Sequence, residues 1–195
     1  MSTTRHDSQI PVLVATKRHS DARGWFSETF NERSLAACGI GCRFVQDNQS
    51  MSLLKGTVRG LHYQIPPKSQ AKLVRVTRGR ILDVAVDIRR DSPTCGQFVS
   101  AELSEDNGLQ LYIPAGFAHG FCTLEDATEV SYKVSDFYSP DHDRGVHWND
   151  PRIAIPWPVT AADAIVSEKD AAQPLLDHLQ SPFAYSGTPL AALSL

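Results

Sequence analysis

The stretch Val58-Arg-Gly-Leu-His-Tyr-Gln64 has the pattern of an apolar strand that is interrupted by polar side chains. A Pro-Pro turn follows it, and a second apolar strand then carries Lys72 inward among aliphatic residues. Arg59 is always a cation, whereas His62 can accept a proton near neutral pH. The sequence therefore places a fixed cation and a candidate base on paired strands, a layout that suits proton abstraction.

The chain after this stretch is strand-like as far as Phe137. Residues 71–77 and 80–88 predict a hairpin with a turn at Gly79-Arg80, and the second arm alternates strictly between two faces. Four further strands are expected at 97–103, 110–113, 119–124 and 129–137, separated by Gly, Pro and Asp-Asn turns. Many short strands at this spacing are typical of an all-β sandwich or closed roll.

The N-terminal part predicts three more strands, at 10–17, 25–30 and 43–52. Two short peripheral helices are also expected. One covers Asn31–Cys38, with Asn31 as its N-cap, and the other begins at Ser167, which is followed by an acidic first turn.

Length and composition predict one globular domain over residues 1–195, with 42% apolar residues and a net charge of −3. This charge gives no reason to expect nucleic acid as a partner. No apolar run approaches the roughly 18 residues that cross a bilayer, and the polar segment Met1–Gln9 has no export signal. We therefore expect a cytoplasmic protein with reduced cysteines.

A metal site is not expected. The segment Ile113-Pro-Ala-Gly-Phe-Ala-His-Gly120 resembles the second conserved segment of cupins, in which the histidine often binds metal. The first segment, however, offers His62-Tyr-Gln64 rather than a His-x-His pair. His62 and His119 alone do not supply the three protein ligands of a usual catalytic metal site.

Acid–base chemistry fits the residues better. Abstraction of a proton beside a carbonyl needs a base, a cation at the forming enolate oxygen and an acid that returns the proton. His62 is the candidate base, Lys72 and Arg59 are candidate cations, and a tyrosine is the candidate acid. Either Asp83 or Asp170 could orient the imidazole, and spacing does not choose between them. A strand histidine or tyrosine also has an ordinary structural interpretation, whereas a lysine among apolar residues needs a partner or a function.

Ten segments, taken in order from Ile10 to Asp170, resemble the dTDP-4-dehydrorhamnose 3,5-epimerase family. They are Asp21-x-Arg-Gly-x-Phe26-x-Glu28, Gln46-x-Asn48-x-Ser50-x-Ser52, Arg59-Gly-Leu-His-Tyr-Gln64, Lys72-Leu-Val, Asp83-Val-Ala-Val-Asp87, Pro114-x-Gly-Phe-Ala-His-Gly-Phe121, Tyr132-Lys, Tyr138-x-Pro140, Trp148-Asn-Asp-Pro151 and Ser167-x-Lys-Asp170. The resemblance implies a cupin-type double-stranded β-helix, or jelly roll, and a cofactor-independent isomerase that acts as a homodimer. The substrate would be dTDP-4-dehydro-6-deoxy-D-glucose, inverted at C3 and C5 beside the C4 ketone.

The resemblance also implies residue roles. His62 would be the proton acceptor, paired with Asp170, Tyr132 would be the proton donor on the opposite face of the sugar, and Lys72 would stabilise the enolate. Substrate contacts would come from Arg59, His119, Gln46, Asn48, Tyr138, Asp143 and Lys169. Arg23, Phe26 and Glu28 would reach the nucleotide from the neighbouring subunit.

One position departs from the family pattern. Asp143 stands where the family usually has glutamate, so its carboxylate keeps the charge but reaches one methylene less far. Two alternatives stay open. The first is a related enzyme, either a mono-epimerase at C3 or C5 or a ketoisomerase, that acts on a related dTDP-4-keto-deoxysugar. The second is a nucleotide-sugar-binding module without turnover.

Overall fold

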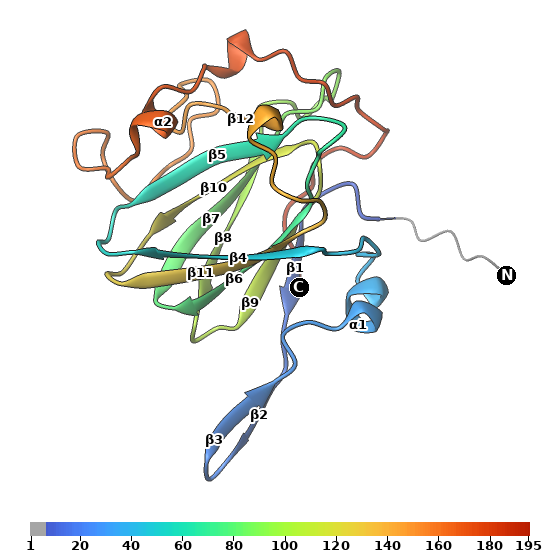
Figure 1. Cartoon of the computed structure of the whole chain (residues 1–195), viewed down its shortest axis with the longest axis vertical. Coiled ribbons are helices and arrows are strands. Elements are labelled where there is room, and N and C mark those ends of the chain that lie inside the picture. Colours follow the sequence, from blue (N-terminus) through green and yellow to red (C-terminus); the bar gives the residue numbers. More distant parts are fainter. Residues whose placement is uncertain (1–6) are drawn as a thin grey trace, which may run out of the picture.

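The chain folds into two five-stranded antiparallel sheets that face each other (Figure 1). This computed structural model describes residues 7–195. The first sheet has the spatial order β1 (Val12–Ala15), β9 (Leu109–Ile113), β6 (Lys72–Arg78), β11 (Thr128–Val134) and β4 (Gln46–Ser52). The second has the order β12 (Asp143–Gly145), β5 (Val58–Gln64), β10 (Phe117–Thr123), β7 (Arg80–Asp87) and β8 (Phe98–Ser104). The prediction of a mainly-β roll is confirmed.

The smaller elements lie at the periphery. A two-stranded hairpin, β2 (Arg18–Asp21) and β3 (Gly24–Ser27), extends away from the sandwich (Figure 1). The helices are α1 (Glu32–Ala37) and α2 (Glu168–Ala171), with 3₁₀ turns η1 (Pro140–His142) and η2 (Leu176–His178). Among the described residues, no helix has the length and apolar character needed to cross a membrane.

Both predicted helices form, and their caps explain where they begin. The Asn31 carboxamide accepts the backbone N–H groups of Arg33 and Ser34, and the Ser167 hydroxyl accepts that of Asp170. Several predicted strands are shorter than expected: β1 covers only Val12–Ala15, β3 ends at Ser27, β4 begins at Gln46 and β11 ends at Val134.

The predicted hairpin between residues 71–77 and 80–88 is wrong. Both strands exist, but β6 pairs with β9 and β11, whereas β7 pairs with β8 and β10. The chain crosses from one sheet to the other at Gly79, which has φ 77°. A Cβ there would lie 2.5 Å from the Thr128 hydroxyl, so only glycine fits this crossover.

β7 explains why a polar pocket can exist inside the sandwich. Its aliphatic residues Val84 and Val86, together with Ile88 directly after the strand, pack outward against the segment that follows β12. Its other face turns Asp83 and Asp87 into the interior, and both aspartates are fully buried. Alternation therefore directs carboxylates into the space between the sheets, where each needs a cationic or hydrogen-bonding partner.

Asp87 has such a partner in Arg89. The guanidinium donates to the carboxylate through Nη2 at 2.7 Å and Nε at 2.9 Å, and the Ser92 and Thr94 hydroxyls donate to the same group at 2.7 Å. Burial raises the pKa of Asp87, but these hydrogen bonds outweigh it and hold the pKa below its ordinary value. Arg89 also donates to the carbonyl of Thr188, which fastens the C-terminal tail to the sandwich.

We predict that Arg89→Met destabilises the protein by about 3–5 kcal/mol, because it leaves the Asp87 carboxylate buried and uncompensated. The adjacent Arg90 is exposed and pairs only with Asp91, so Arg90→Met should cost less than about 1 kcal/mol. Urea unfolding at neutral pH measures both changes. Equal losses for the two variants would contradict a specific role for the buried pair.

Candidate active site

A cavity of about 460 Å³ opens between the two sheets, and its walls come from β4, β5, β6, β10, β11 and the segment leading into α2. The predicted residues that line it are His62, Tyr132, Asp170, Lys72, Arg59, His119 and Lys169. These residues are far apart in the sequence, and the sheet pairings bring them together. The cavity is therefore the candidate site for the proton chemistry expected from the sequence.

His62 lies on β5 with its Nε2 2.6 Å from Oδ1 of Asp170. The other carboxylate oxygen of Asp170 accepts the backbone N–H of Gly60 at 3.1 Å. Burial raises the pKa of Asp170, but the hydrogen bonds from His62, Gly60 and Ser167 lower it by more. The pKa therefore lies below its ordinary value, and the group is held as a carboxylate. A carboxylate at Nε2 favours the tautomer with the proton there, which leaves Nδ1 with a free lone pair.

The neighbouring strand carries a second histidine with its own carboxylate. His119 on β10 is directly opposite His62 in the register, and its Nε2 lies 2.7 Å from Oδ1 of Asp83. Asp83 therefore belongs to His119, and Asp170 belongs to His62, a choice that spacing in the sequence left open. Burial lowers the pKa of His119 although Asp83 acts in the opposite direction, which favours a neutral imidazole.

Lys72 is the buried cation of the cavity. Its ammonium donates to the backbone carbonyl of His62 at 3.1 Å. Burial lowers its pKa to about 8, and the negative charges of Asp143 and Asp83 limit this fall. At neutral pH the side chain is therefore still mostly charged, close to the strand that carries the candidate base.

Tyr132 occupies the opposite wall, because β11 belongs to the first sheet and β5 to the second. Burial raises the pKa of its phenol, and the charge of Arg59 partly offsets this rise. The phenol therefore keeps its proton at neutral pH and can act as a donor. A base on one sheet and an acid on the other can approach a planar reactant from its two faces.

The other candidates of the main body lie beside the cavity. Gln46 and Asn48 follow each other on the inward face of β4, and the Gln46 amide donates to the Asn48 side-chain oxygen at 2.8 Å. Gln46 also accepts the backbone N–H of Tyr138 at 3.1 Å. The Asp143 carboxylate accepts hydrogen bonds from the Lys169 ammonium and from the Tyr138 hydroxyl, the latter at 3.2 Å.

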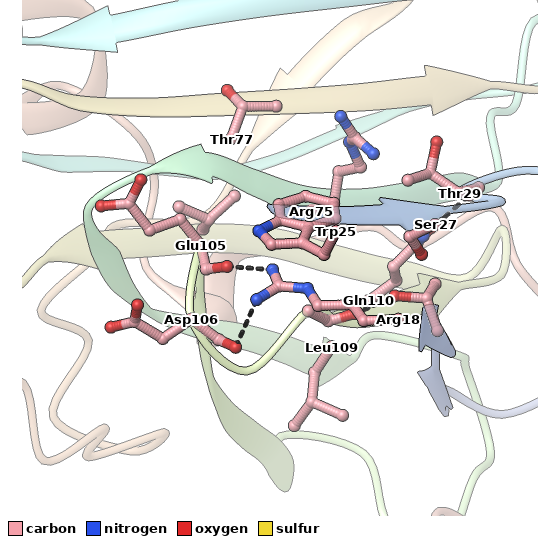
Figure 2. Close-up of a pocket in the computed structure, with 13 residues that line it drawn as sticks. Arg18, Trp25, Ser27, Thr29, Arg75, Thr77, Glu105, Asp106, Leu109 and Gln110 are labelled. Carbon is pink, nitrogen blue, oxygen red and sulfur yellow. Dashed lines mark hydrogen bonds between the residues drawn. The ribbon is translucent and has the colours of Figure 1, made fainter. Parts of the chain in front are cut away.

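Arg23, Phe26 and Glu28 do not approach the cavity of their own chain. They belong to the β2–β3 hairpin and the residue after it, where Phe26 is 71% exposed and Arg23 pairs with Asp21. Figure 2 shows the base of this hairpin, where the Arg18 guanidinium stacks on Trp25 and donates to two backbone carbonyls of the β8–β9 turn. The hairpin thus carries its exposed side chains away from the sandwich.

Several lining residues were not among the candidates from the sequence. Ser50 is the most informative, because its hydroxyl is buried without a hydrogen-bond partner among the described residues and it lines the cavity. Its position on the same period-two face as Gln46 and Asn48 could have indicated it. Phe121 and Val166 supply apolar wall and follow no pattern that distinguishes them from core residues.

Comparisons with known proteins indicate the family of the chain. A family model described as dTDP-4-dehydrorhamnose 3,5-epimerase matches residues 9–178. A curated dTDP-4-dehydrorhamnose 3,5-epimerase of Sinorhizobium fredii is 52% identical over 173 residues, which cover 89% of this chain and 88% of that protein. Many solved structures also match, and they include complexes with nucleotide and with nucleotide sugar.

Three of these structures illustrate the similarity. The enzyme of Bacillus anthracis, with TDP and pyrophosphate bound, is 50% identical with a TM-score of 0.82, covering 90% of this chain and 97% of that chain. The 3,5-epimerase of Legionella pneumophila, in complex with dTDP-4-keto-L-rhamnose, is 42% identical with a TM-score of 0.85, covering 93% and 97%. A 3′-monoepimerase of Streptomyces bikiniensis matches at 32% identity and a TM-score of 0.79, covering 88% and 87%. On the family model and these relatives, the chain belongs to the dTDP-4-dehydrorhamnose 3,5-epimerase family.

Proposed function

We propose that this protein converts dTDP-4-dehydro-6-deoxy-D-glucose to dTDP-4-dehydro-L-rhamnose by inverting C3 and C5. The observation that carries the proposal is the pairing of His62 with Asp170 on one wall of the cavity and Tyr132 on the other, with the Lys72 cation among them. Membership of an isomerase family and the ligands in the titles of related structures support the substrate class.

The chemistry proceeds by proton transfer alone. His62 takes the proton from the carbon beside the C4 ketone, and the electron pair of the broken C–H bond moves into an enolate at the C4 oxygen. Lys72 stabilises this oxygen, and Tyr132 returns a proton to the opposite face of the carbon. A positioned acid or base contributes roughly 10²- to 10⁴-fold in rate. No electron leaves the sugar, so the reaction needs no redox cofactor.

Contacts outside the reacting ring are proposed from charge and position. Arg59 donates to the Ser52 hydroxyl and the Met51 carbonyl, both at 3.1 Å, and its remaining N–H groups can bind a diphosphate oxygen. His119, Lys169, Gln46, Asn48 and Tyr138 are proposed as further sugar and nucleotide contacts. Four free cysteines in the chain support a reducing compartment, and the cytoplasm is the proposed location.

A homodimer is proposed because part of the predicted nucleotide site is missing from its own cavity. Arg23, Phe26 and Glu28 extend from the sandwich on the β2–β3 hairpin (Figure 1). A second copy could receive them, and in a twofold dimer each subunit would then complete the site of the other.

The first prediction from the proposed function concerns the base. We expect His62→Ala to lose at least about 10²-fold in turnover at both carbons while it stays folded, because no other described group replaces the imidazole. NMR in deuterated water follows deuterium entering C3 and C5 of the substrate. His178, an exposed histidine on η2, supplies the matched control variant His178→Ala.

The labelling pattern also separates the alternatives. Wild-type enzyme should place deuterium at both carbons, whereas label at one carbon would identify a mono-epimerase, the activity of the Streptomyces bikiniensis relative. Absence of label at both carbons would refute this substrate and favour a binding module. Substantial exchange by the His62→Ala variant would refute the assignment of the base.

The second prediction tests contacts from the partner subunit. His62→Ala and the double variant Arg23→Ala/Phe26→Ala should each have little activity as homodimers. When the two chains are co-expressed, we expect roughly a quarter of wild-type activity, because half of the dimers are then mixed and each mixed dimer has one complete site. Failure of the mixed dimers to recover activity would place these contacts within one chain.

The third prediction is a pH dependence. Lys72 must be charged to stabilise the enolate, so kcat/KM should fall as pH rises through about 8, the lowered pKa of this lysine. The raised pKa of Tyr132 places the loss of its proton at higher pH. Lys72→Arg keeps a permanent cation, and the decline near pH 8 should disappear even if the rate is lower. Persistence of that decline in Lys72→Arg would assign it to another group.

A further inference from the structure

The Asp143 carboxylate binds Lys169, a residue that lines the cavity. It begins β12, the edge strand that pairs with β5, and the register sets Asp143 opposite Gln64 and Gly145 opposite His62. Its Oδ2 accepts both the Lys169 ammonium and the Tyr138 hydroxyl. The side chain is 12% exposed, so these two donors and not solvent are its main partners.

Lys169 and Asp170 are adjacent in α2, and they bind different strands of the same sheet. Lys169 binds Asp143 on β12, while Asp170 binds His62 on β5. α2 has only four residues, and a helix of this length does not persist without tertiary contacts. The position of Asp170 therefore depends on the contacts that fasten α2 to the sheet.

We propose that Asp143 is a positioning residue for the reaction, which ties α2 to β12 through Lys169 and thereby holds Asp170 against His62. The proposal rests on the proposed function of the cavity. Both protein donors bind Oδ2 of Asp143, so the proposed role works through Lys169 and Tyr138 and does not need a contact to the sugar. The shorter reach of aspartate, compared with the glutamate usual in the family, suits this internal role.

The surroundings of Asp143 give the conditions for a test. Lys169 and Tyr138 bind it, and it also acts electrostatically on Lys72 and Tyr132 across the cavity. Removal of its charge lowers the pKa of Lys72 from about 8. Assays at about pH 6 keep that lysine charged in every variant and so separate positioning from this electrostatic effect.

The experiment compares Asp143→Asn with Asp141→Asn, which removes the same charge two positions earlier. The side chain of Asp141 is exposed and makes no hydrogen bond or ion pair among the described residues. We expect kcat of Asp143→Asn to fall roughly 10- to 100-fold, because misplacement of a catalytic group by about 1 Å costs up to 10²-fold. Asp141→Asn should keep the wild-type kcat.

Lys169→Met and the double variant Asp143→Asn/Lys169→Met complete a double-mutant cycle on kcat. If the two residues act as one tie, either single change breaks it, and the double variant should have a kcat within about threefold of the worse single variant. Asp143→Glu keeps the charge and a hydrogen-bond acceptor, and it should recover most of the kcat lost in Asp143→Asn. Thermal unfolding checks that each variant is folded under the assay conditions.

A spectroscopic measurement separates positioning from general stability. In the wild type, Asp170 favours the His62 tautomer with its proton on Nε2. Side-chain ¹⁵N NMR, assigned by the loss of one signal in His62→Ala, should show this preference weakened in Asp143→Asn and unchanged in Asp141→Asn. A folded Asp143→Asn variant with wild-type kcat, or with raised KM alone and an unchanged tautomer, would overturn the proposal. Inactivity of the wild type toward the dTDP-keto sugar would instead refute the proposed function, and the tautomer result would still report on the tie.

Discussion

The pairing of each cavity histidine with its own aspartate is the constraint on which the site depends. His62 and His119 are opposite each other on neighbouring strands, yet each imidazole is oriented by a carboxylate of its own. Asp170 reaches His62 from α2, whereas Asp83 reaches His119 from β7. A buried carboxylate is costly unless it is hydrogen-bonded, and here each carboxylate meets an imidazole at hydrogen-bond distance. The two pairs therefore fix the rotamers of both histidines in the interior of the sandwich.

The two pairs differ in a way that suits different roles. Asp170 accepts hydrogen bonds on both oxygens, and His62 is partly exposed to the cavity, so this imidazole is both oriented and accessible. His119 is buried, and the second oxygen of Asp83 has no partner among the described residues. That oxygen contributes to the negative potential that offsets the burial of Lys72. The Asp83–His119 pair thus helps to keep the Lys72 ammonium charged inside the protein, a role that involves no proton transfer.

The sequence predicted the parts of the structure that depend on local patterns. Alternation in β7, the Asn31 cap and the Ser167 cap are short-range signals, and the structure contains each of them. The pairing of β6 and β7 depends instead on which sheet each strand joins, and a Gly turn between two strands is equally compatible with a hairpin and a crossover. The choice between Asp83 and Asp170 was beyond local patterns for the same reason. Family resemblance, not spacing, indicated Asp170, because its contact with His62 spans 108 positions. Ser50 shares the period-two face of Gln46 and Asn48, but only the structure shows that its buried hydroxyl has no partner among the described residues.

The arrangement of base and acid also indicates where single and double epimerases can differ. His62 and Tyr132 are on opposite walls. A ring carbon can therefore be inverted only when its hydrogen faces His62 and the opposite face of that carbon is turned toward Tyr132. C3 and C5 flank the same ketone, so the ring must shift within the cavity for both carbons to meet these two groups. Ser50, Phe121 and Val166 line the same cavity without a proposed role in proton transfer, so they bound the space in which the ring can shift.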